Sequence, residues 1–62
     1  MVYNNTPEFA LNGVLRNPLA STVVLKSVCA EVRRRLDADE LSDGMKAKLV
    51  HALTSVKERL EG

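Results

Sequence analysis

Two amphipathic stretches separated by a short acidic segment fill residues 18–60 and constrain the fold more than any other feature of this chain. In each stretch, apolar residues recur every three or four positions, which is the spacing of one face of an α-helix. The chain has 45% hydrophobic and 27% charged residues, which is too apolar for a disordered segment. Because each helix must bury its apolar stripe, we predict an all-α fold.

The first stretch predicts a helix over residues 18–36, because Asn17 is a suitable N-cap and Pro18 suits the first helical position. One face of this helix gathers the apolar residues that we assign to the core, which are Leu25, Val28, Cys29, Val32 and Leu36, with Val24 at the edge. The opposite side carries a second apolar stripe, formed by Leu19, Val23 and Ala30. This stripe calls for a partner, either the segment around Phe9 or another subunit.

The second stretch predicts a helix over residues 43–60 with a seam of Met45, Leu49, Leu53, Val56 and Leu60. The acidic and short polar residues between the two helices, 37–42, favour a turn, with Ser42 as the preferred N-cap and Asp39 as the second choice. A short connection makes neighbouring helices antiparallel. Residues 18–60 therefore predict an antiparallel αα-hairpin.

The N-terminal segment, residues 1–17, contains a second helix-start pattern. Thr6 as N-cap and Pro7 at the first position predict a short helix that runs to about Asn12. Gly13 then suits a helix end, although the apolar residues 14–15 can continue the helix. The apolar content of this segment indicates that it docks on another part of the structure.

A chain of 62 residues forms a single domain, 1–62, whose own core is small because such a domain buries only about 60% of its unfolded surface. Small domains commonly gain stability by self-association, so we expect a homo-oligomer in which two or more hairpins complete a helical bundle. Its subunit number is left open. The residues that we assign to this oligomer or partner interface are Phe9, Leu11, Leu19, Val23 and Ala30.

The composition argues against several functional classes. A net charge of +1 creates no global field toward nucleic acid or a membrane. One cysteine, Cys29, and one histidine, His51, are too few for a protein-only zinc site, and neither belongs to a catalytic constellation. We therefore expect no enzyme, no metal and no cofactor. The lone cysteine and the lack of a membrane span or signal peptide favour the cytoplasm.

Arginines 33–35 form the densest positive charge in the chain. On a helix, Lys26, Arg33 and Arg34 share a side, whereas Arg35 leans toward the apolar residues. Guanidinium groups match phosphate oxygens, so this side is a candidate anion site. The competing interpretation, which we favour, is that these cations complement the helix C-terminus and face the acidic turn.

Tyr3 begins a polar stretch and offers an aromatic ring that can stack on a base. Together with Lys26 or Arg33 from another subunit, it would form a nucleotide pocket at a subunit boundary. The competing interpretation is an ordinary extended terminus.

Two hypotheses for function follow. The first is a small homo-oligomeric helical-hairpin regulator or inhibitor, bacterial or phage in type, that acts by stoichiometric binding of another protein. The second is an oligomeric binder or sponge for a nucleotide, cyclic nucleotide or nucleic-acid segment, which would use Tyr3, Lys26, Arg33 and Arg34. Small helical hairpins occur among plasmid regulators and phage inhibitors, but this is an analogy of architecture, which does not assign function.

Overall fold

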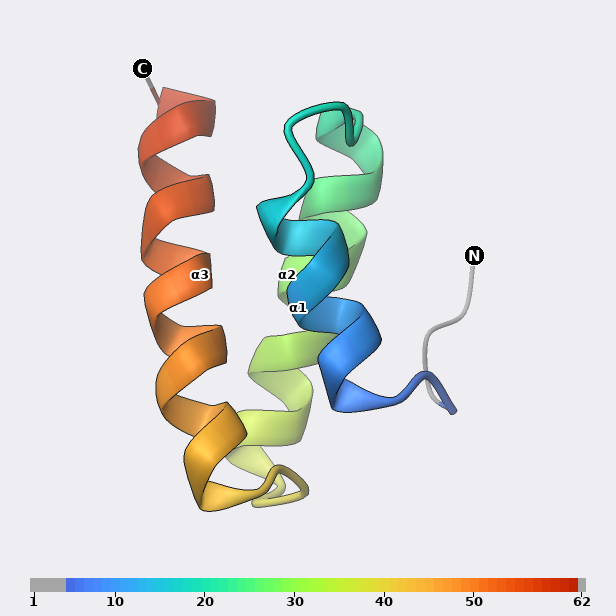
Figure 1. Cartoon of the computed structure of the whole chain (residues 1–62), viewed down its shortest axis with the longest axis vertical. Coiled ribbons are helices and arrows are strands. Elements are labelled where there is room, and N and C mark those ends of the chain that lie inside the picture. The colour runs from blue at the N-terminus through green and yellow to red at the C-terminus, as the bar shows by residue number, and fades with distance from the viewer. Residues whose placement is uncertain (1–4, 62) are drawn as a thin grey trace.

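The computed structural model describes residues 5–61, and within this range it contains three helices and no strand (Figure 1). Helix α1 spans Glu8–Arg16, α2 spans Thr22–Asp37 and α3 spans Asp43–Glu61. Helices α1 and α3 run in one direction and α2 runs in the other (Figure 1). The predicted all-α class is confirmed.

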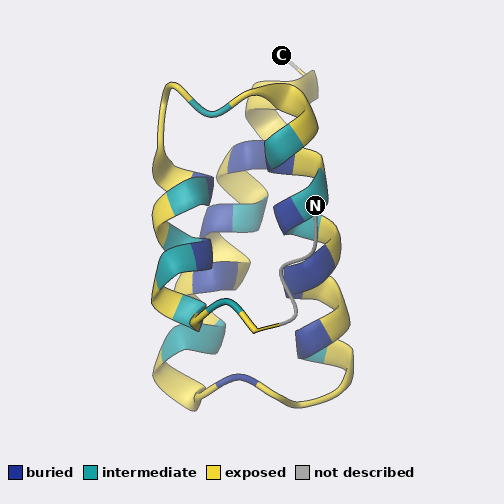
Figure 2. Ribbon diagram, turned by 90° about the vertical axis from the view of Figure 1, so that its right-hand side faces the viewer, coloured by how far each residue is buried: buried dark blue, intermediate teal, exposed yellow. Residues whose placement is uncertain are grey.

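All three helices contact one another, and together they bury a core inside a single chain (Figure 2). Its buried apolar side chains are Leu11, Leu15, Leu25, Val28, Val32, Leu41, Leu49, Ala52 and Val56. Leu11, which we assigned to an oligomer or partner interface, is instead fully buried in the core of the single chain. The short α1 supplies the third side of the core, because its Leu11 and Leu15 lie four residues apart on one face.

The predicted core face of α2 is confirmed. Its central residues are buried, and Val24, Cys29 and Leu36 are partly buried against them. The seam of α3 is confirmed over most of its length but ends before Leu60, which is 38% exposed. Sequence reasoning missed Ala52, a small residue within the α3 seam.

Helix α1 is longer than the sequence predicted and begins one residue later. Pro7 is its N-cap, and no side chain caps the helix, so the expected cap by Thr6 is not formed. The helix continues through Gly13 to Arg16 because Leu15 gains a place in the core. It ends where Asn17 adopts an extended conformation (φ −76°, ψ 116°), as expected for a residue that precedes a proline.

Helix α2 begins four residues after the predicted Pro18. The amide of Leu19 donates to Asn17 Oδ1 (2.9 Å), and the amide of Ala20 donates to the Asn17 carbonyl (3.2 Å). Asn-Pro therefore forms a turn here and not a helix start. The N-cap is Ser21, whose hydroxyl accepts a hydrogen bond from the backbone amide of Val24 at 3.2 Å.

Helix α2 ends in a Schellman motif. Asp39 has φ 55°, in the left-handed region, its amide donates to the Leu36 carbonyl (3.2 Å), and the Glu40 amide donates to the Arg35 carbonyl (2.9 Å). Asp39 therefore ends α2 and does not cap α3. The following Leu41 turns inward and is 7% exposed, which brings the connection into the core.

The predicted N-cap of α3, Ser42, is confirmed by its hydroxyl, which accepts from the Met45 amide at 3.4 Å. The same hydroxyl donates to Glu8 Oε1 (2.6 Å), and the Ser42 amide donates to Glu8 Oε2 (3.1 Å). These hydrogen bonds lower the pKa of Glu8. They also join the start of α1 to the start of α3.

Candidate binding groove between two helices

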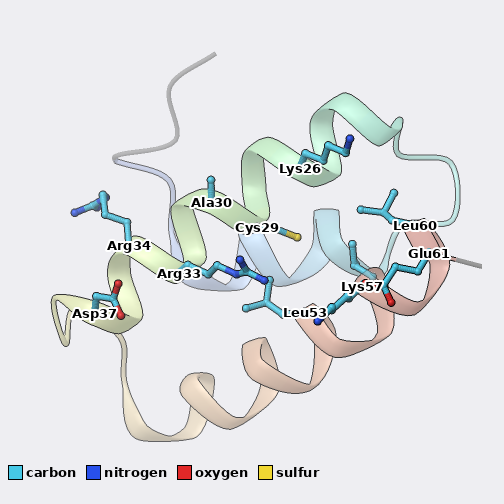
Figure 3. Close-up of a pocket in the computed structure, with 11 residues that line it drawn as sticks. Lys26, Cys29, Ala30, Arg33, Arg34, Asp37, Leu53, Lys57, Leu60 and Glu61 are labelled. Atoms are coloured by element: carbon cyan, nitrogen blue, oxygen red, sulfur yellow. The ribbon is translucent and has the colours of Figure 1, made fainter.

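An open groove with a volume of about 660 Å³ runs between α2 and α3 (Figure 3). This volume lies within the range of ordinary ligand-binding clefts. Residues from both helices line it and none comes from α1, which packs on both helices elsewhere. The groove exists because α1 covers only one side of the α2–α3 pair and leaves the other side open.

The floor of the groove is apolar. It consists of Cys29, Leu53, Val56 and Leu60, with the exposed Ala30 at the outer edge of α2. Val56 belongs to the core, whereas Leu53 is partly buried and Leu60 is 38% exposed. The part of the α3 seam that the core does not cover therefore becomes the floor of this groove.

Four cations line the groove, Lys26, Arg33 and Arg34 on α2 and Lys57 on α3. Lys26, Arg33 and Lys57 form no ion pair with another residue in the range 5–61, whereas Arg34 is paired with Glu31 and Glu40. Figure 3 shows the Arg33 side chain extending toward Leu53. The structure thus brings three predicted ligand residues, Lys26, Arg33 and Arg34, to one groove and adds Lys57, which the sequence analysis did not select.

Among the described residues that line the groove, the acidic ones stand at its two ends. Asp37 is the last residue of α2 and Glu61 is the last residue of α3. Because α2 and α3 run in opposite directions, these two carboxylates lie at opposite ends (Figure 1). The groove is therefore positive over its middle.

Arg34 has a different role from Arg33. Its Nη2 lies 2.8 Å from Glu31 Oε2 and 3.1 Å from Glu40 Oε2. The side chain points away from the groove in Figure 3, although part of it lines the edge. The expectation that these cations face the acidic turn is met for Arg34 by its pair with Glu40.

Glu31 accepts hydrogen bonds from both Arg34 and Arg35. Arg35 Nε donates to Glu31 Oε2 at 2.7 Å, and Arg35 Nη1 donates to the carbonyl of Thr6 at 2.6 Å. Hydrogen bonds from Arg34 and Arg35 lower the pKa of Glu31 to about 2. The sequence analysis missed this cluster, although Glu31 lies three and four residues before the two arginines, the spacing that pairs charges on a helix.

Cys29 is a partly buried thiol on the groove floor. Desolvation raises its pKa, and the positive charge of Arg33 opposes this in part. A raised pKa makes Cys29 a poor nucleophile, so it acts here as a small apolar residue.

The remaining predicted interface residues lie outside the groove or at its edge. Leu19 is 90% exposed, Val23 is 74% exposed and Phe9 is 69% exposed, so α1 does not cover the second apolar stripe. Tyr3 lies outside the described residues. His51 lies on another side of α3, in a shallow hollow with Val50 and Thr54.

In residues 5–61, no group of three or more His, Cys, Asp or Glu side chains is placed to hold a metal ion. Over the same residues, no helix has the length and hydropathy required to cross a bilayer.

Comparison with known protein families, with curated proteins and with solved structures finds no match to this chain.

Proposed function

We propose that this protein is a small, non-enzymatic regulator or inhibitor that acts by stoichiometric binding of another protein in the α2–α3 groove. The observation that carries this proposal is the apolar floor between two helices, with Leu60 38% exposed at one end. Grooves between packed helices commonly receive a further helix through its apolar face. The cations beside the floor would then give orientation and specificity.

We propose in addition that copies of the α2–α3 hairpin associate. Support comes from two exposed apolar residues, Leu19 in the turn that precedes α2 and Val23 in the first turn of α2, which are 90% and 74% exposed. A few buried anchors provide most of the energy of a protein interface. Leu19 and Val23 do not line the groove, whereas Ala30, the third residue of the second apolar stripe, does.

A matched pair of variants tests the protein-binding role. Leu60→Glu places a charge in the groove, whereas Val50→Glu places the same charge on another side of α3 at a similar exposure, 48% against 38%. A photoreactive side chain at Ala30, beside the groove, should crosslink to the partner in cells. We expect Leu60→Glu to abolish the crosslink and Val50→Glu to preserve it.

The exposed Ala47, which lies outside the groove, provides the position control for this crosslink. Crosslinks of equal yield from Ala30 and Ala47, or a crosslink that survives Leu60→Glu, would contradict the proposal.

The second candidate function is an oligomeric binder or sponge for an anionic ligand such as a nucleotide, a cyclic nucleotide or a nucleic-acid segment. The observation in its favour is the gathering of Lys26, Arg33 and Lys57 beside one groove without ion-pair partners in the described range. Calorimetric titration with AMP, cyclic AMP and a short oligonucleotide tests it. Arg33→Glu should remove the binding heat, and affinity should fall steeply with salt if several phosphates are held.

A further inference from the structure

We infer that the partner segment is an amphipathic helix that carries carboxylates on both flanks of its apolar stripe. This inference rests on the proposed protein-binding function of the groove and names the chemistry of the occupant. It is carried by the arrangement of charge along the groove, together with the groove's length and apolar floor.

The length of the groove suits a helix of about three turns. On α2 it is lined from Lys26 to Asp37, a distance of about 17 Å at 1.5 Å per residue. The apolar floor runs along α3 from Leu53 to Leu60, which is two turns of helix. Apolar side chains repeated every three or four residues on the occupant would lie on this floor.

The charged residues that line the groove determine which charge the flanks of the occupant should carry. Lys26 and Arg33 stand on the α2 side seven residues apart, and Lys57 stands on the α3 side. An occupant helix with carboxylates on both flanks of its middle turns would meet a cation on each side of the groove. Carboxylates beyond its middle would be repelled by Asp37 or Glu61 at the ends.

The same pattern disfavours a second copy of this chain in the groove. A two-fold axis through the middle of the groove would bring one positive centre onto another, because Lys26, Arg33 and Lys57 all lie between the terminal acids. Like charges brought together at an interface oppose association. Self-association is therefore assigned to the stripe at Leu19 and Val23, and the groove to a different partner.

Three synthetic peptides of about 14 residues, four helical turns, test this inference. All share one leucine stripe, and their flanking positions carry Glu, Gln or Lys. Each is titrated into isotope-labelled protein while the backbone amide signals are followed by NMR, which assigns binding to a site. We expect the Glu peptide to shift the amides around the groove and to bind about tenfold more tightly than the Gln peptide, with the Lys peptide weakest.

A pair of charge-reversal variants provides the control. Arg33→Glu should reverse the order, so that the Lys peptide binds more tightly than the Glu peptide. Lys48→Glu, the same change of charge at an exposed position outside the groove, should leave the order as it was.

The outcomes distinguish the carboxylate assignment from the helix-binding function of the groove. Groove amides that shift equally with all three peptides would overturn the carboxylate assignment and leave the helix-binding groove standing. Shifts confined to amides outside the groove, or the absence of any shift in the groove with all three peptides, would overturn both the carboxylate assignment and the helix-binding groove.

Discussion

Glu31 and Arg35 lie one helical turn apart on α2 and form an ion pair in which each side chain is only 9% exposed. The distance from Arg35 Nε to Glu31 Oε2 is 2.7 Å. Because Arg35 also donates to the carbonyl of Thr6, this pair connects the C-terminal half of α2 to the segment that leads into α1. The pair is therefore a structural feature, and it separates Arg35 from the cations of the groove.

Replacing Glu31 by Ala should lower the free energy of unfolding by about 1–3 kcal/mol, because the buried Arg35 loses one of its hydrogen-bond acceptors. Urea denaturation followed by circular dichroism measures this change. Glu58→Ala, at an exposed position on α3, is the control and should change the free energy of unfolding by less than about 0.5 kcal/mol. Equal effects of the two variants would show that the Glu31 pair does not stabilise the fold.

The low pKa of Glu31 also predicts how stability depends on pH. The pKa is about 2 in the folded chain against an ordinary value of 4.5, so folding favours the ionised carboxylate. This contribution is fully present above pH 4.5 and is lost as the pH falls from there toward 2. Acid titration should therefore show the difference in unfolding free energy between the natural chain and Glu31→Gln shrinking over this interval. A difference that stays constant from pH 6 to pH 2 would contradict the assignment.

Local sequence rules predicted the existence of the long helices well and their starts less well. Ser42 was found as the N-cap of α3 because its hydroxyl needs only the residues that follow it. At Asn17-Pro18 the same rules favoured a helix start, but these residues also suit a turn, and the path of the chain from α1 to α2 selects the turn. The Schellman end at Asp39 was missed because glycine, the usual residue, is absent there.

Gly13 shows how tertiary packing overrides a local signal. Asn12-Gly13 suits a helix end, yet the burial of Leu15 extends α1 beyond it. Apart from its chain neighbours and the nearby backbone of α1, a methyl group added at Gly13 would meet no atom of residues 5–61 within 4 Å, and the residue has no positive φ. Gly13→Ala should therefore raise the free energy of unfolding by about 0.5–1 kcal/mol in a thermal or urea melt. A decrease would mean that α1 does not continue through this position.

Val23 tests the self-association part of the proposal. Its side chain is 74% exposed in the single chain, so Val23→Asp should leave the fold intact while it removes an apolar anchor. For the natural chain, we expect a thermal midpoint that rises with protein concentration, because association stabilises the folded state by mass action. The midpoint of Val23→Asp should be independent of concentration, whereas Val50→Asp should behave as the natural chain does. A natural midpoint that is constant over a hundredfold dilution would argue against an oligomer.

The candidate site was predicted only in part. Helical geometry alone placed Lys26 and Arg33 on one side, and the structure brings both to the groove. Helical geometry did not predict that Lys57 joins them, because the position of a residue on α3 relative to α2 depends on how the two helices pack. Arg34 was selected by the same geometry, but its position relative to Glu40 depends on the path of the turn, which the spacing of residues does not define.

Native mass spectrometry of the protein purified gently from its own cells tests the central claim most directly, because one spectrum reports both copy number and any retained partner. We expect a complex in which this chain and a second protein are present in a fixed ratio, and we expect Leu60→Glu to lose the second protein while Val50→Glu retains it. A chain or homo-oligomer that carries only the extra mass of a nucleotide would contradict the protein-binding account and support the anionic-ligand function in its place.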